Sequence, residues 1–228
     1  MLRRLIAFLL RSAIWILKWL LGLFEHGDDH DHDHGNDGHH HGDDPDDSDT
    51  KRPPKPGEVA PDVTISPAQT QQQIQRTFAS AVAGTVGGSD PTPDVVWVDG
   101  DNELLVRPSK TRVVLRTGFV LIGISVNADQ TGDVEIVVPF AVGAPNEPLG
   151  LIASTDAVPR GPDAIVTVWG DQLIAAAWDA LLRFSAMTAG TAGVDEDHQP
   201  LLPMAIVADT NGLTVTPQAR HTFDRVPR

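Results

Sequence analysis

An α+β domain with a mostly antiparallel sheet and two helices is the fold class that the sequence predicts for residues 59–228. Three observations predict it. Short runs rich in Val, Ile and Leu alternate with Gly, Pro and Asp turn signals. The pairs Asp99-Gly100 and Asn211-Gly212 indicate hairpins, because these residue types tolerate the positive φ of tight turns. Two longer segments carry helical spacing with start and stop residues. A β-sandwich decorated by two helices is the alternative.

Residues 1–25 are predicted to form an amphipathic helix that associates with a membrane. Thirteen Leu, Ile and Phe residues lie in this segment, and no small-x-small cleavage site follows them. Four of its charged residues recur every seven positions and therefore share one stripe of a helix: Arg4, Arg11, Lys18 and Glu25. An in-plane helix is favoured over a spanning anchor, while bundling with copies of itself or burial in a soluble core are further possibilities. The residues expected to contact lipid are Arg4, Arg11, Trp15, Lys18 and Trp19.

Residues 26–58 are predicted to be a disordered linker that is rich in His and Asp and then contains Pro. Residues 26–50 hold ten Asp and no Lys or Arg, which is most of the formal net charge of -14. Such a composition cannot bury enough apolar surface to fold. Neutral imidazole binds zinc and nickel, so the tract can also collect these metals in a labile, pH-dependent way. The candidate ligands are His26, His30, His32, His34, His39, His40 and His41.

The domain is expected to contain two helices. The first follows an N-cap at Ser66 and ends before Gly84. The second runs from an N-cap at Asp171 to about Ala189, with Gly190 as its stop. The expected strands are 95–98, 103–107, 111–117, 119–128, 133–142 and 164–169, followed by a hairpin at 204–216.

A small basic surface is predicted on the strand at 111–117 and just before it. Alternation places Arg112 and Arg116 on one face of this strand, and Arg107 and Lys110 precede them in the sequence. This surface could contact anionic lipid or the acidic residues of a partner protein, and an ordinary solvated sheet face is the alternative. The candidate partner-binding residues are therefore Arg107, Lys110, Arg112 and Arg116.

The search for chemistry in the domain finds no phosphate loop, no dinucleotide fingerprint and no complete nucleophile elbow. The chain has no Cys, which excludes disulfides and thiolate chemistry. A charged loop at 195–198 could ligate a metal or form an acid/base pair, but an ordinary loop explains it with less. A catalytic site assembled from dispersed residues such as Ser125, Asp156 and His221 stays an alternative.

The function predicted from these features is a non-enzymatic, membrane-tethered scaffold or adaptor that self-associates or holds a partner protein at the membrane. An enzyme with a dispersed site and a metal-handling protein are the alternatives. No cofactor is required, and labile zinc or nickel is the metal expected. Nucleic acid is excluded as a partner, because 31 acidic residues outnumber 17 basic ones. An in-plane helix leaves the domain on the cytoplasmic face, which is favoured over export by a spanning helix.

Overall fold

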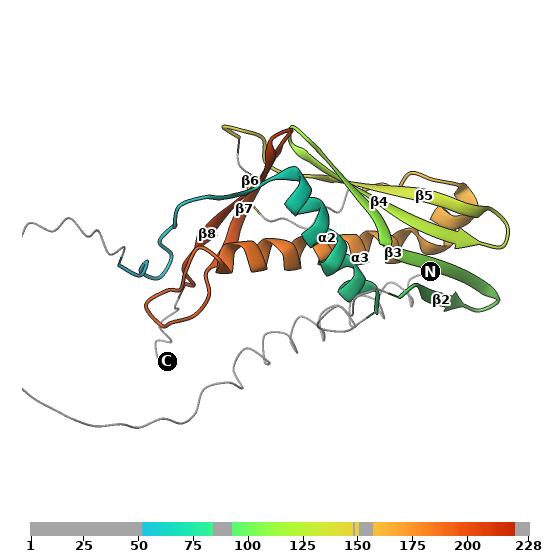
Figure 1. Ribbon diagram of the computed structural model, residues 1–228, viewed down its shortest axis with the longest axis horizontal. Coiled ribbons are helices and arrows are strands. Elements are labelled where there is room, and N and C mark those ends of the chain that lie inside the picture. Colours follow the sequence, from blue (N-terminus) through green and yellow to red (C-terminus); the bar gives the residue numbers. More distant parts are fainter. Residues whose placement is uncertain (1–51, 84–92, 148, 151–156, 222–228) are drawn as a thin grey trace, which may run out of the picture. The chain divides into compact units, whose positions relative to one another are not determined.

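Two helices and two antiparallel sheets form the described part of the chain, which comprises residues 52–83, 93–147, 149–150 and 157–221 of a computed structural model (Figure 1). This arrangement confirms the predicted α+β class and its antiparallel pairing, but the strands form two sheets and not the single sheet predicted. The predicted membrane helix and most of the predicted linker lie outside the described residues. In chain order the elements are β1 (Val63–Ile65), α2 (Pro67–Ala83), β2 (Val95–Asp99), β3 (Asn102–Arg116), β4 (Phe119–Ala128), β5 (Gly132–Ala141), β6 (Leu149–Gly150), α3 (Asp163–Gly190), β7 (Leu202–Asp209) and β8 (Gly212–Gln218).

The extension of β5 past its C-terminal end joins the two sheets. One sheet is the meander β2-β3-β4-β5, and the other has the order β1-β8-β7-β6. Gly143, just after β5, forms a parallel bridge with Val207 of β7. Its N–H donates to the Ile206 carbonyl at 2.9 Å, and its carbonyl accepts from Ala208 N at 3.0 Å. The backbone therefore continues from one sheet to the other.

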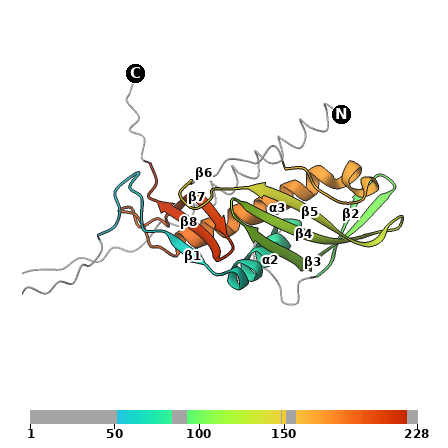
Figure 2. The same cartoon turned by 90° about the horizontal axis from the view of Figure 1, so that it is seen from above.

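Helix α3 supports both sheets from one side, as the views in Figures 1 and 2 agree. It contacts β4 and β5 of one sheet and β7 and β8 of the other. Leu173, Leu181 and Phe184 are fully buried along it, and each such burial stabilises the fold by about 1.5–3 kcal/mol. Helix α2 packs across α3, where Thr77 Oγ1 donates to the Ala180 carbonyl at 2.9 Å. A shared core beneath the two sheets follows from this packing.

The strand predicted at 164–169 is wrong, because this segment is the first part of α3. Its β-branched residues favour a strand locally. However, Ile165, Trp169 and Leu173 recur every four residues and are all buried, which only a helix achieves here. Asp171 is consequently an exposed residue inside the helix and not its N-cap. Tertiary burial has overridden local propensity.

The two strands predicted at 103–107 and 111–117 are one strand, β3, with a register shift between Arg107 and Arg112. Pro108 lies in this interval, and proline is tolerated at such irregularities because no ladder hydrogen bond is required of it. The gap between the two predicted strands coincides with this irregularity. The structure instead keeps β3 paired with β4 on both sides of it.

Both predicted hairpins exist, but each turn is displaced by one residue. The closing pairs are Asp99 with Asn102 and Asp209 with Gly212. In the second hairpin, Asp209 Oδ1 accepts from the backbone N–H of Asn211 at 2.7 Å and of Gly212 at 3.0 Å. Gly212 lets β8 approach β1 closely, because a Cβ at this position would lie 2.3 Å from the carbonyl oxygen of Ile65 in β1. The short strands β1 and β6 had no sequence signal.

Candidate interaction edge

The outer edge of β2 is a row of backbone groups that no other described strand pairs with. A two-residue loop closes the β2–β3 hairpin, so Asp99, Trp97 and Val95 direct their backbone groups toward β3. Val96 and Val98 therefore direct theirs away from the sheet. Their side chains are 54% and 63% exposed. We refer to the stretch Val95–Asp99 as the β2 edge.

The β2 edge is held in place from its inner side. Trp97 packs on Trp169 of α3, with ring centroids 6.2 Å apart and planes tilted by 40°. Trp169 is itself buried, and Val95 packs against the same core. Because the inner residues are anchored in this way, the strand presents Val96 and Val98 from a fixed position.

The neighbouring stretch of β3 is covered by side chains of α2. Gln71 donates from Nε2 to the Thr111 carbonyl at 2.7 Å and accepts at Oε1 from Val113 N at 2.6 Å. Gln75 donates to the Ser109 carbonyl in the same way. The amide of Gln71 thus replaces the donor and acceptor of a missing strand. The i,i+4 spacing of Gln71 and Gln75 places both side chains on one helix face, but this spacing alone does not predict the strand that they contact.

The predicted basic surface is interleaved with acidic residues. Arg107 is partly buried, and its guanidinium lies 2.6 Å from the Asp133 carboxylate and 3.6 Å from that of Asp94. Hydrogen bonding to Asp133 raises the pKa of Arg107, and the same bond, with one from Asn127, lowers the pKa of Asp133. The predicted role of this residue in partner binding stays a prediction, and its charge is already matched within the domain.

The other three predicted basic residues are exposed on β3. Arg112 lies 3.6 Å from Glu135 of β5. Gly123 of β4 pairs with Arg112, whereas Glu135 pairs with Ser125, two residues further along β4. A Cβ at Gly123 would meet the Glu135 carboxylate at 2.9 Å, so this carboxylate lies diagonally over the glycine. The glycine therefore leaves room for the carboxylate to reach across β4. Lys110 and Arg116 are exposed as well, so the face carries cations and carboxylates side by side.

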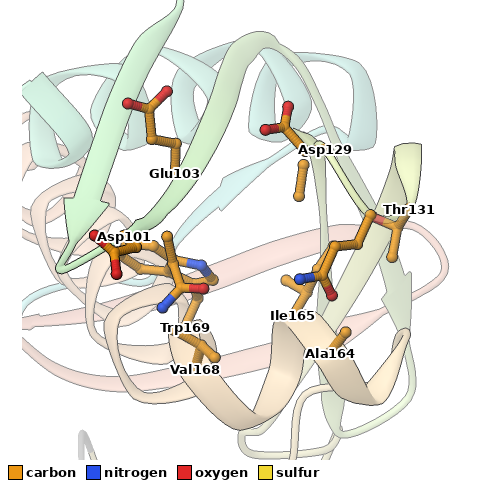
Figure 3. Close-up of a pocket in the computed structure, with 11 residues that line it drawn as sticks. Asp101, Glu103, Asp129, Thr131, Ala164, Ile165, Val168 and Trp169 are labelled. Atoms are coloured by element: carbon orange, nitrogen blue, oxygen red, sulfur yellow. The ribbon is translucent and has the colours of Figure 1, made fainter.

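A hollow of about 90 Å³ lies beside the tips of the β2–β3 and β4–β5 hairpins (Figure 3). Trp169, Ile165 and Val168 of α3 form its apolar side. In Figure 3 the carboxylates of Glu103 and Asp129 extend away from these residues. These two carboxylates lie apart from one another in this view and do not converge on one point.

Among the described residues, the candidates for chemistry lie in separate places. Asp195 is buried, and its Oδ1 accepts from Asp197 N at 3.0 Å and Gln199 N at 2.9 Å, so it organises its own loop. Ser125 lies in β4 between Arg107 and Glu135. His221, also part of the dispersed-site alternative, follows β8 beside Gly57. Asp156 lies outside the described residues.

The predicted metal and membrane residues all lie before residue 52 and hence outside the described residues. Within the described ranges, no group of three or more His, Asp or Glu side chains is placed to hold a metal ion. One described helix, α3, is long and apolar enough to cross a membrane by length and composition. Its contacts with both sheets and α2 instead assign it to the core of the domain.

The comparisons with known proteins add no relative. No protein-family model matches the chain, and no curated protein or solved structure matches it.

Proposed function

We propose that the chain is a non-enzymatic, membrane-tethered scaffold or adaptor, whose C-terminal domain is a protein-interaction module. In this proposal residues 1–25 bind the membrane as an amphipathic helix and residues 26–58 act as a disordered tether. The domain then self-associates or holds a partner protein near the lipid, on the cytoplasmic face. Its partners are membrane lipid and protein.

The observation that supports this proposal is the β2 edge. A strand edge with outward N–H and C=O groups is a template for pairing with another strand, and natural proteins usually cover or charge such edges. Here the two outward residues are Val96 and Val98, both exposed and apolar. Addition of a strand would satisfy their backbone groups and bury their side chains.

A photo-crosslinking residue at position 98 of the full chain tests the module in native membranes. Position 158 is the matched control, since Val158 is 67% exposed and lies outside the helices and strands. We expect an adduct of defined mass from position 98 that position 158 does not give. Adding Val96→Lys should remove it, because an edge lysine opposes strand pairing. Equal adduct patterns from positions 98 and 158 would contradict the proposal.

Removal of residues 1–25 tests the tether separately. The truncated chain should leave the membrane fraction while the domain keeps its melting temperature, because the described core uses residues after 51. A truncated chain that stays with the membrane would assign lipid contact to the domain itself.

A further inference from the structure

We infer that the occupant of the β2 edge is the β2 edge of a second copy of this chain, paired antiparallel across a two-fold axis at Trp97. The inference rests on the proposed function and names its partner. Two four-stranded meanders would then form one continuous sheet.

The register of this pairing follows from the strand itself. Antiparallel self-pairing overlaps all of Val95–Asp99 only when Trp97 lies opposite Trp97 of the second copy. Val96 then lies opposite Val98 of the second copy, and both residues direct backbone groups outward. Each of the two symmetric Val96–Val98 pairs exchanges two N–H···O bonds. A shift of two residues either way leaves only 95–97 or 97–99 paired.

The charges near the β2 edge are compatible with this register. Asp99 lies opposite Val95 of the second copy, and Asp94 lies opposite Gly100, which has no side chain. No carboxylate therefore faces another directly across the pair, an arrangement that would be destabilising. Asp94 is also 3.6 Å from Arg107 within its own chain.

The side chains match as well. Val96 and Val98 meet on the outer face as cross-strand pairs of β-branched residues. The two Trp97 rings are neighbours on the inner face, at a non-hydrogen-bonded position where Cα atoms are about 4.5 Å apart. Each ring keeps its contact with Trp169, so the aromatic cluster of one chain continues into the next.

The opposite border of the sheet explains why association would stop at two copies. Val137 of β5 exchanges backbone hydrogen bonds of 2.9 Å in both directions with Arg160, which occupies part of that border. An interface on a two-fold axis uses the same surface of both copies and closes. Pairing through β2 therefore predicts a dimer and not a fibre.

Cysteine crosslinking tests the register, because the chain contains no native Cys. Full-length Val96→Cys and Val98→Cys proteins are mixed in mild detergent, allowed to exchange and oxidised. Directly paired Cα atoms are about 5.5 Å apart, within the 4.4–6.8 Å range of disulfides. The Cα atoms of the same residue in the two copies are about 8 Å apart, a distance that follows from the spacing between strands and the rise along them. The mixture should give several-fold more disulfide dimer than either variant alone, and more than Val158→Cys.

A mixture that crosslinks no better than Val158→Cys, or Val96→Cys that crosslinks best with itself, would overturn the inference. Molecular mass provides the second measurement. Full-length protein should be dimeric and Val98→Lys monomeric with an unchanged circular dichroism spectrum, whereas Val158→Lys should stay dimeric. A monomeric wild type, or a Val98→Lys dimer, also overturns it. If position 98 still crosslinks to a different protein, only the self-pairing fails; if it crosslinks to nothing, the proposed function fails too.

Discussion

Two adjacent stretches of one sheet border satisfy their backbone groups in opposite ways. Along residues 109–113 of β3, Gln71 and Gln75 of α2 supply side-chain amides to the strand. Along β2, no described group covers the outward N–H and C=O of Val96 and Val98. The covered stretch is closed to further strands, and the open stretch can accept one. The difference teaches that the domain closes part of this border and leaves a specific five-residue strand available.

Both stretches depend on the packing of α3, so we expect the largest loss of stability from a substitution in the core of this helix. Phe184 is fully buried at the centre of the core. Phe184→Ala should lower the free energy of unfolding by about 3–5 kcal/mol, through lost burial and the cavity that remains. Chemical denaturation measures the change, with Met187→Ala as the control, since Met187 is 59% exposed on the same helix. If both variants lost a comparable free energy of unfolding, the buried face of α3 would not be what supports the two stretches.

The next effect is specific to the covered stretch. Gln71→Ala leaves the Thr111 carbonyl and the Val113 N–H without their side-chain partner. We expect a loss of about 1–3 kcal/mol, the cost of unsatisfied buried polar groups, and faster hydrogen exchange at the Val113 amide. Gln71→Glu should be intermediate, because a carboxylate still accepts from Val113 N but cannot donate to Thr111.

Gln72→Ala is the matched control for this experiment. Gln72 is exposed on the same helix, and alanine is a favourable helix residue, so its stability should stay almost unchanged. If Gln71→Ala behaves like Gln72→Ala, water satisfies the β3 border and the contrast between the two stretches disappears.

The sequence predicted the elements that have local signals and was wrong where long-range contacts decide the structure. Helix α2 and strand β4 were correct because their signals are local: Ser66 and Pro67 begin the helix, and the turn at 129–132 ends the strand. The start of α3 was wrong because its β-branched residues become helical only through burial against two sheets. These long-range contacts are not visible in any short window of sequence.

The sequence predicted the strand of the candidate interaction edge but not its position at the border of the sheet. The apolar run at 95–98 before Asp99-Gly100 predicted a strand, but its place at the border depends on the order of the whole sheet. The role of Gln71 was missed for the same reason, since a helical glutamine carries no sign of the strand that it covers. A usable signal is the mismatch in length between β2 and β3, which leaves part of β3 without a strand partner on that side.

A smaller effect concerns the ion pairs beside the β2 edge. The Arg107 hydrogen bond lowers the pKa of Asp133 below the ordinary Asp value of about 3.9. The stabilisation is therefore fully present above that ordinary value and is lost as pH falls through the lower pKa of the folded state. Carbon NMR titration of the Asp133 carboxyl should show the lowered midpoint, and Arg107→Gln should raise it. An unchanged midpoint in that variant would remove Arg107 as the cause.

The smallest expected effect is at the open edge itself. Val98 is 63% exposed, and its backbone N–H points away from β3. Val98→Lys should therefore change the free energy of unfolding by about 0.5 kcal/mol or less, as is usual for surface positions. Denaturation at a concentration where the chain is monomeric measures this, and hydrogen exchange should find the Val98 amide fast while that of Val113 stays slow. A loss near that of Gln71→Ala would mean that Val98 supports the fold, and the open edge would then be structural and not an interaction surface.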